Sequence, residues 1–380
     1  MRYLIFIFLF SNILLFISSC NNSASKRSQE YPARLVKAKE LIQFELDDST
    51  SFDNNNLVVS NYRNEEVLVV ESKHKNSIQY YSISERRKVK EIKFSKEGEN
   101  PIFEIHGFTI INQDSIIVYD KYKANAFLVN SEGIVIEKIK LTDNRLLNHA
   151  SMTRLPNVLI DNKLCMFIFP QTSIDEDNFF DGDVKFELVY DLQTGYSYYV
   201  DFSWPEIYQS RKWTFFHTFP SRIKGKNNKL IYSFGADHYI YELSLSGDYR
   251  KHLAKSDHFE EIESLSVGED ETESFLKNGV YGMIIYDPYR DVYYRIVGVK
   301  TNPLLPDGRK KSASYKQYGV IILDSNFNKI GETLLDPLES FRIKDWFVCE
   351  QGLCISTANY LNKNINEDLM EFNILQLVYE

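Results

Sequence analysis

Two stretches of the chain carry residues whose types and spacing could do chemistry. The first is the acidic run QTSIDEDNFFDGD (171–183), whose carboxylates lie close enough in sequence to suit a hard cation such as Ca²⁺. These carboxylates belong to Asp175, Asp177, Asp181 and Asp183. Their spacing departs from the EF-hand loop, in which ligands alternate and a glycine stands at the sixth position. We therefore interpret the run as a solvated acidic loop and expect no metal site.

The second stretch, FVCEQGLCIS, places Cys349 and Cys354 on either side of the turn EQGL. A hairpin would set the two cysteines directly opposite each other, where they could form a disulfide in an oxidising compartment. The alternative is a pair of small apolar side chains in the core. Cys165, in KLCMFIF, is expected to be a buried free thiol.

The N-terminal segment is typical of bacterial export. Arg2 precedes a nearly unbroken apolar run over residues 3–17, which is shorter than a membrane-spanning helix requires. We interpret residues 1–20 as a signal peptide whose ending, FISSC, resembles a lipobox in which Cys20 becomes lipid-modified. An ordinary secretory signal with a chance cysteine is the alternative. The polar residues 21–33 are expected to form a flexible tether.

Composition excludes some classes of protein and favours strands. The chain has 53 acidic against 44 basic residues, which argues against a nucleic-acid surface. Its hydrophobic content is 43%, with 25 Tyr and 26 Phe, which is enough for a large core. Aromatic and β-branched residues dominate the apolar runs, so we expect an all-β protein.

A sequence repeat of roughly fifty to sixty residues occurs six times, and each copy reads as four short strands. Such a repeat of four-stranded units is typical of a β-propeller. The clearest copies are residues 107–141 and 221–254, which align almost turn for turn. The six expected blades cover residues 56–94, 107–141, 157–202, 221–254, 282–335 and 341–379. A seven-bladed ring with one degenerate member, or a different all-β repeat, is the alternative.

The last expected blade is one strand short, and the missing strand is found near the N-terminus. The segment KAKELIQFEL (37–46) resembles the outer strands of blades one and two. We predict that it completes blade six, which closes the ring and removes two exposed sheet edges. Residues 34–380 are then a single domain. A short surface helix is expected in the insert EEIESLSVGEDETESF (260–275).

Propeller geometry predicts where a binding site would lie. Residues just before each inner strand converge on one face of the ring, which they share with the loops between the second and third strands. These residues are Asn56, His106, His149, Arg154, Trp213, His217, Tyr281 and Arg342. Such a mouth would suit an anionic or hydroxyl-rich ligand flanked by aromatic surface. For each histidine, a hydrogen-bonded structural role is the alternative.

Motifs of common enzymes are absent from the sequence. It contains no HExxH, no GxSxG, no P-loop and no glycine-rich dinucleotide turn. Some six-bladed propellers are calcium-dependent lactonases with carboxylates and Asn in the channel, whereas His and Arg stand at the corresponding positions of this chain. Asp287 and Arg290, in YDPYRDVYYRI, are expected in a structural turn on the opposite face. We therefore expect no catalytic residues and no cofactor.

The stretch GVYGMIIYDPYRDVYYRIVG (279–298), together with the lipobox and the six blades, resembles the uncharacterised six-bladed, TolB-like propeller lipoproteins of Bacteroidetes. This resemblance implies a fold and a cell-envelope address, and it transfers no catalytic residues. Surface-exported lipoproteins of this group usually carry acidic residues after the cysteine. Because NNSASKRSQ follows Cys20, the resemblance favours a lipoprotein of the outer membrane that faces the periplasm.

The sequence therefore predicts a monomeric, membrane-tethered propeller that binds or scaffolds without catalysing a reaction. Its mouth would hold a peptide, a glycan fragment or a loop of an envelope protein. The competing hypothesis is a hydrolase or lyase that acts on a sugar or lactone at the same mouth.

Overall fold

The structure is a computed structural model that describes residues 31–51, 56–121, 125–141, 149–169, 179–180, 184–337, 343–363 and 365–380. Residues Tyr31–Glu380 form one compact unit. The expectations for the signal peptide and Cys20, for the four aspartates of the acidic run and for Arg342 lie outside the described residues. Within the described residues, no helix is long and apolar enough to cross a membrane.

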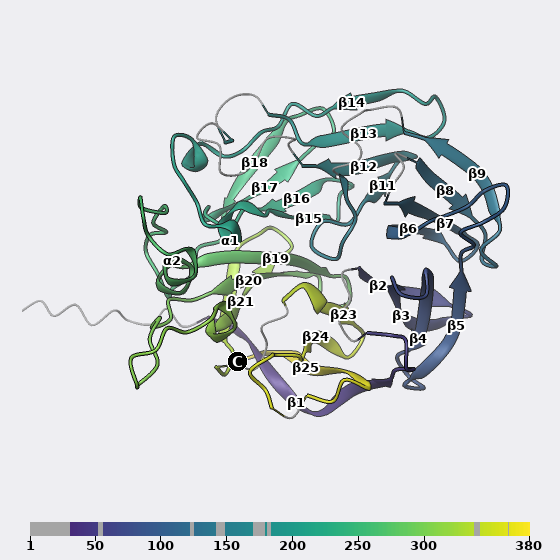
Figure 1. Cartoon of the computed structure of the whole chain (residues 1–380). Coiled ribbons are helices and arrows are strands. Elements are labelled where there is room, and N and C mark those ends of the chain that lie inside the picture. Colours follow the sequence, from purple (N-terminus) through teal and green to yellow (C-terminus); the bar gives the residue numbers. More distant parts are fainter. Residues whose placement is uncertain are drawn as a thin grey trace, which may run out of the picture. The chain divides into compact units, whose positions relative to one another are not determined.

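The described strands form six antiparallel sheets around a central axis, which confirms the six-bladed propeller (Figure 1). Blade one contains β2 (Leu57–Tyr62), β3 (Glu65–Ser72), β4 (Ser77–Ser82) and β5 (Arg87–Lys93). Blade two contains β6 (Ile105–Asn112), β7 (Ser115–Asp120), β8 (Asn125–Val129) and β9 (Val135–Lys140). Blade three contains β10 (His149–Ala150), β11 (Val158–Ile160), β12 (Lys163–Ile168), β13 (Glu187–Asp191) and β14 (Ser197–Tyr199).

The other three blades repeat the pattern. Blade four contains β15 (Ser221–Lys224), β16 (Leu230–Ser233), β17 (Tyr239–Leu243) and β18 (Tyr249–Leu253). Blade five contains β19 (Val280–Asp287), β20 (Val292–Gly298), β21 (Tyr318–Asp324) and β22 (Lys329–Leu334). Blade six contains β23 (Phe347–Cys349), β24 (Gly352–Ser356), β25 (Leu369–Tyr379) and, from the other end of the chain, β1 (Ala33–Glu45).

Strand β1 closes the ring as the sequence predicts. It pairs antiparallel with β25, so that Ile42 lies opposite Phe372 and Phe44 lies opposite Met370. The side chains of Ile42 and Phe44 are fully buried. The strand begins at Ala33, inside the segment that was expected to be tether. Every described strand and the closure of the ring lie within the compact unit.

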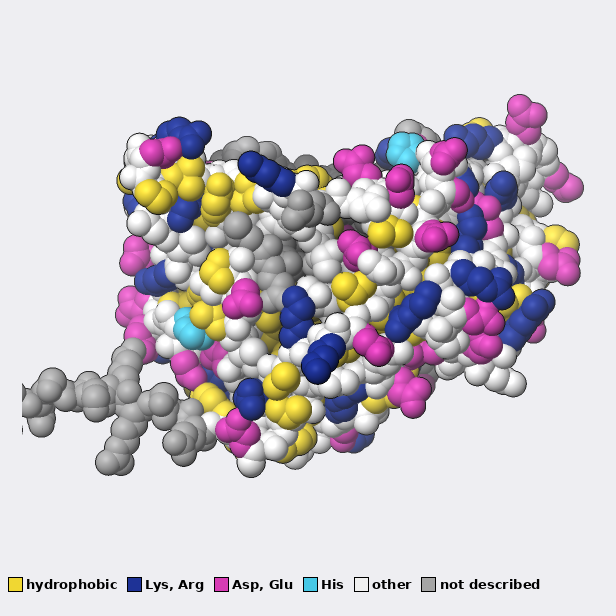
Figure 2. Space-filling view, turned by 90° about the horizontal axis from the view of Figure 1, so that it is seen from below, with side chains coloured by type: hydrophobic (Ala, Val, Ile, Leu, Met, Phe, Trp, Pro, Cys, Tyr) yellow, Lys and Arg dark blue, Asp and Glu magenta, His cyan; other side chains and the backbone are white. Residues whose placement is uncertain are grey.

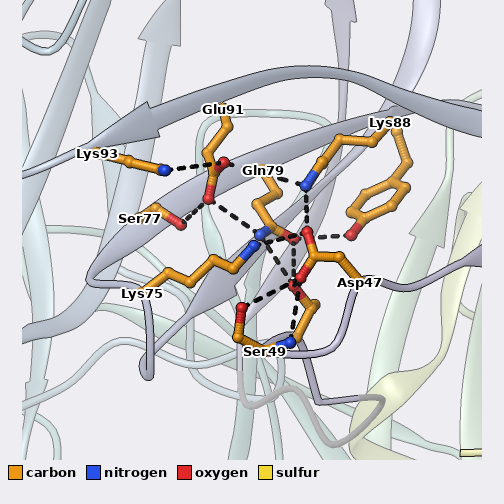
Figure 3. A network of polar contacts seen from close by, with 10 residues as sticks. Asp47, Ser49, Lys75, Ser77, Gln79, Lys88, Glu91 and Lys93 are labelled. Atoms are coloured by element: carbon orange, nitrogen blue, oxygen red, sulfur yellow. Dashed lines mark hydrogen bonds and ion pairs between the residues drawn. The ribbon is translucent and has the colours of Figure 1, made fainter. Parts of the chain in front are cut away.

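The segment that follows β1 is fixed to blade one by a polar network (Figure 3). Asp47 Oδ2 lies 2.6 Å from Lys75 Nζ and 2.5 Å from Lys88 Nζ. Burial opposes ionisation of Asp47, but the two lysines and Thr50 outweigh it and hold the pKa of Asp47 well below its usual value. The network thus joins the closing strand to the next blade.

Short hairpin turns set the strand register. Arg63 and Asn64, between β2 and β3, have φ of 52° and 63°. Asp161 and Asn162, between β11 and β12, have φ of 48° and 62°. Two consecutive residues with positive φ define the turn whose twist matches that of the flanking strands, and asparagine tolerates this conformation well.

Two local expectations need correction, and a third, the short helix in the insert 260–275, is confirmed. Residues Ile343–Asp345, expected to be part of a strand, form the 3₁₀ helix η4, and the strand starts only at Phe347. Strand β10, which pairs with β12, precedes the expected start of blade three. The insert 260–275 contains helix only at its end, where α2 (Glu271–Lys277) begins after Asp270, whose carboxylate accepts from Glu273 N.

The surface shows no separation of charge on the side seen in Figure 2. Basic and acidic side chains are interspersed there, over the side of the ring turned toward the viewer. A surface that follows a nucleic-acid backbone needs clustered positive charge instead.

Candidate functional site

A pocket of about 340 Å³ opens on the face at which the chain enters the inner strands of blades four, five and six. Segments from blades three to six line it, and each lies just before or at the start of a strand. The lining residues are Met152, Arg154, Phe215, Phe216, Phe219, Phe275, Val280, Tyr281, Gly282, Tyr318, Ile343 and Lys344. We call this the mouth pocket. It lies on the face that propeller geometry predicts.

One wall of the mouth pocket is aromatic. The short helix α1 (Phe215–Thr218) supplies Phe215 and Phe216, and Phe215 also packs against Phe219, with the ring centroids 4.6 Å apart. Phe216 stacks on Phe275 of α2, with the centroids 3.9 Å apart. Phe215 is 52% exposed although it is a large apolar side chain. Exposed aromatic surface beside a hollow is typical of ligand sites.

A buried lysine holds the α2 side of this wall. Lys316 is 1% exposed, and its ammonium group donates to the carbonyls of Phe275 and Leu276 and to that of Asn278. Burial lowers the pKa of Lys316. The three carbonyls lie at the C-terminal end of α2, where unpaired backbone oxygens favour a cation. Lys316 therefore fixes Phe275 against Phe216.

Arg154 supplies positive charge to the mouth pocket. It lies in the tight turn Met152–Leu155, whose end residues bond each other through N–H and C=O groups. Its Nε donates to Pro220 O at 2.9 Å, and its Nη2 donates to Phe219 O. Burial lowers the pKa of Arg154 to about 10, so the guanidinium stays charged at neutral pH.

The polar groups of the mouth pocket are unbalanced in charge. Lys344, from η4, is the second cation among the described lining residues, and no carboxylate is among them. Tyr318 is 6% exposed, and burial raises the pKa of its hydroxyl, so it stays protonated. An anionic group would be attracted by the positive charge of the Arg154 and Lys344 side chains.

Tyr281 lines the mouth pocket, but its hydroxyl is engaged elsewhere. The oxygen lies 2.6 Å from His238 Nδ1 and accepts from Ser256 N at 3.1 Å. The hydroxyl is therefore not available to a ligand in this arrangement.

His217 and Trp213 lie in the wall behind the mouth pocket. His217 is fully buried, with Nδ1 2.8 Å from Thr214 Oγ1 and Nε2 2.9 Å from Gly279 O. Because a carbonyl only accepts, Nε2 carries the proton and Nδ1 accepts from Thr214. Burial lowers the pKa of His217 to about 4, so the ring is neutral. Trp213 is 5% exposed, and its ring centroid lies 5.6 Å from that of His217.

The remaining predicted residues do not line the mouth pocket. His106 is half-buried on β6, next to Gly107, whose φ of 101° and close approach to Ser151 leave no room for a side chain. His149 lies in β10, where its backbone pairs with Ile168. Asn56 is buried. The structure thus brings Arg154 and Tyr281 to one pocket and places two other predicted residues in its wall.

Sequence reasoning missed most of the aromatic wall. Phe215, Phe216 and Phe219 follow Trp213 in the run WTFFHTF, and this concentration of aromatic residues before an inner strand was a usable signal. Tyr318 and Lys344 carry no comparable signal, because their role depends on how loops of different blades converge.

The hairpin β23–β24 differs from the expected register. Cys349 lies opposite Gly352, and Phe347 lies opposite Cys354, so the cysteines are diagonal neighbours rather than directly opposite. Both are buried free thiols with their Sγ atoms 3.5 Å apart. The hydrogen bond between the two thiols lowers the pKa of Cys349.

Cys165 is a buried free thiol, as predicted, and burial raises its pKa to about 12.

Two further observations concern chemistry outside the mouth pocket. Asp287 is fully buried, and its Oδ2 accepts from Arg290 Nη1 and from Tyr294 OH, each at 3.0 Å, so both charged residues stabilise their turn. Within the described part of the chain, His, Cys, Asp and Glu side chains form no group of three or more that could hold a metal ion.

Comparisons with known proteins show the fold. The sequence profile of a domain of unknown function, DUF4221, matches residues 32–334. The structure of a DUF4221 member from Bacteroides vulgatus has a TM-score of 0.79 at 20% identity, covering 92% of this chain and 99% of that chain. The structure of a protein from Bacteroides fragilis, described as a putative exported protein, has a TM-score of 0.54 at 10% identity, covering 92% of this chain and 96% of that chain. No curated protein matches the chain.

Proposed function

The chain belongs to the DUF4221 family, and we propose that it is a non-enzymatic binding or scaffolding propeller whose mouth pocket holds a segment of a peptide or partner protein. The observation that carries this proposal is the pairing of an aromatic wall with two cations and no carboxylate among the described lining residues. An apolar side chain of the ligand fills the space beside Phe215 and Phe216. A ligand carboxylate lies toward Arg154 and Lys344.

A peptide suits the mouth pocket better than a glycan fragment does. Its lining is mostly aromatic and aliphatic, with few groups that could bond sugar hydroxyls. A polyol would lose hydrogen bonds to water there without replacing them. Among the described residues, the lining also has no Ser, Cys, His, Asp or Glu, which supports binding over hydrolysis or elimination.

We also propose a cell-envelope address. The ending FISSC supports lipid attachment at Cys20, and the chain shares its fold with a protein described as a putative exported protein, which is consistent with transport across the inner membrane. The mature protein would then be a monomer that faces the periplasm from the outer membrane, with the ring held by its N-terminal tether.

Titration of the full-length protein with short peptides tests this function. The probes are fluorescent peptides that end in Phe or Leu, with either a free carboxylate or an amide at the C-terminus. We expect the carboxylate form to bind at least about tenfold more tightly, since a charge-assisted hydrogen bond is worth about 1.5–3 kcal/mol. Phe215→Ala and Lys344→Gln should each weaken binding. Their matched controls are Tyr249→Ala, which truncates another half-exposed ring, and Lys251→Gln.

Equal binding of the carboxylate and amide peptides would contradict the proposed role of the cations. Binding that survives both mouth-pocket variants would place the peptide elsewhere on the ring.

A further inference from the structure

A second cavity, of about 320 Å³, lies on the axis behind the turn Met152–Leu155. Inner strands β2, β15, β19 and β23 line it, as do residues just before or after them. We call it the axial pocket. In Figure 1 these strands surround the centre of the ring.

The two pockets are stacked along one axis, because neighbouring residues of the same segments line each of them. Gly282 lines the mouth pocket and Met283 lines the axial pocket. Similarly, Lys344 lines the first, and Trp346 lines the second.

The turn Met152–Leu155 is the partition between them. Met152 lines the mouth pocket and Thr153 lines the axial pocket. Thr153 Oγ1 accepts from Leu57 N in blade one at 3.0 Å. Arg154 bonds the carbonyls of Phe219 and Pro220 before blade four. The partition is therefore pinned to opposite parts of the ring.

The walls of the axial pocket are apolar. Val, Ile, Leu and Met side chains from the inner strands predominate, and Lys224 is the one charged residue among the described lining residues. Lys224 ends β15, on the face away from the mouth, where Tyr286 and Tyr289 also line the pocket. An apolar cavity of this kind holds water poorly and favours an apolar occupant.

We propose that the axial pocket binds a linear medium-chain fatty carboxylate. The chain enters from the face that carries the β19–β20 turn, and its methyl end reaches Trp346 and Thr153 at the partition. Its carboxylate stays at the opening, beside Lys224. The ammonium group of Lys224 donates one hydrogen bond to Leu159 O at 3.0 Å, which leaves two N–H groups for the ligand.

This geometry predicts a dependence on chain length. Each buried methylene contributes about 0.8 kcal/mol, so affinity should rise about fourfold per added carbon. The rise should stop once the chain reaches the partition. Because that partition also separates the two pockets, the fatty acid and the mouth-pocket peptide should bind independently.

Tryptophan quenching tests the site directly. The probe is decanoate brominated at its terminal carbon, added in the absence of lipid and detergent to the compact unit Tyr31–Glu380, once its cooperative melting has been verified. Trp346 lines the axial pocket, whereas Trp204 and Trp213 line neither pocket that we describe on the axis. We expect saturable quenching that disappears in Trp346→Phe. Absence of saturable quenching in the unaltered unit, or equal quenching in Trp346→Phe, would overturn the proposal.

Variants at the opening and in the wall give a second measurement. Lys224→Gln should weaken binding about fivefold or more by removing the charge that faces the carboxylate. Its control, Lys226→Gln, removes a lysine that is paired with Asp291 and should leave affinity unchanged. Val59→Phe should fill the pocket, and its circular dichroism and melting show whether the ring stays folded. Phe215→Ala, which abolishes part of the mouth pocket, should not change decanoate binding. A decanoate affinity that is unchanged by Lys224→Gln, together with affinities that do not depend on the chain length of the fatty acid, would refute the proposed site. This outcome is independent of the peptide experiment.

Discussion

The guanidinium of Arg295 lies 3.6 Å from the centre of the Tyr281 ring, and both residues are fully buried. Among the residues that the structure describes, no carboxylate forms a salt bridge with this cation. Its nitrogens instead donate to Ser233 Oγ and to backbone carbonyls that include those of Asp237 and Ala254. Arg295 of blade five thus satisfies the backbone of blade four, and the Tyr281 ring adds a cation–π contact. This explains why Tyr281 serves structure more than ligand binding.

Replacing Arg295 by Met should therefore destabilise the ring strongly. The variant keeps most of the volume but leaves several buried carbonyls unpaired, each at a cost of about 1–3 kcal/mol. We expect a loss of at least about 3 kcal/mol in the free energy of unfolding, measured by urea denaturation. Arg250→Met, at an exposed position on β18, should change it by less than about 0.5 kcal/mol. Similar effects of the two variants would contradict this account.

Closure of the ring makes its own prediction. Phe44 is fully buried against Tyr81 and Phe372, so Phe44→Ala should cost about 3–5 kcal/mol. Leu41→Ala, on the same strand but 39% exposed, should cost far less. Deleting residues 33–45 should expose the edge of β25 and abolish cooperative melting. A deletion variant that melts like the intact unit would show that β1 is dispensable.

The stability of blade one should depend on pH through Glu71. Burial raises the pKa of Glu71 to about 7, while its ordinary value is 4.5. The folded state therefore binds the proton more tightly, and stability is lost as pH rises from about 4.5 through 7, by up to about 3 kcal/mol. Glu71→Gln should remove this loss and melt higher than the unaltered protein at pH 8. Glu97→Gln, at an exposed position, is the control; equal pH profiles for both variants would argue against a buried protonated Glu71.

His217 should act in the opposite direction. Its pKa of about 4 in the fold lies below the ordinary value of 6.5, so the unfolded chain binds the proton more tightly. Stability is then lost as pH falls from about 6.5 toward 4, by up to about 3 kcal/mol. Titration of the imidazole by NMR checks this expectation directly. A midpoint near 6.5 for His217 would contradict a buried ring that stays neutral between Thr214 and Gly279.

The diagonal pair Cys349 and Cys354 should become a disulfide under oxidising conditions. The sulfur atoms already lie 3.5 Å apart, and both thiols are otherwise inert in the core. Alkylation of the oxidised protein after unfolding without reductant should then label Cys165 alone of the three described cysteines. Labelling of all three would show that the hairpin keeps its thiols reduced.

The local sequence pattern predicted the fold more completely than it predicted the candidate site. Alternating apolar residues and short turns mark almost every strand, because each blade is built from neighbouring hairpins. The stretch FRIKDWFV also alternates, yet residues 343–345 form a 3₁₀ helix that brings Lys344 to the mouth pocket. Sequence pattern could not show this, since that turn is fixed by packing against other blades.

The predicted site residues also show that the sequence pattern does not determine which side chains line a pocket. Arg154 was identified from its position before an inner strand, and its place at the mouth pocket follows from the ring. His217 occupies an equivalent position in the sequence, but one turn of helix α1 directs its ring into the wall. A shift of one or two residues in a loop determines whether a side chain lines the mouth pocket or is buried in the wall behind it. The periodicity of the sequence does not predict that shift.

The two ends of the folded unit meet, since Glu380 N donates to Pro32 O at 2.9 Å beside the pairing of β1 with β25. A ring joined in this way has no intrinsic first blade. A short linker between these ends would allow new termini in a surface loop between any two other blades, and the permuted chain should reach the same architecture. The order in which the blades are synthesised is thus a property of the gene rather than a requirement of the fold.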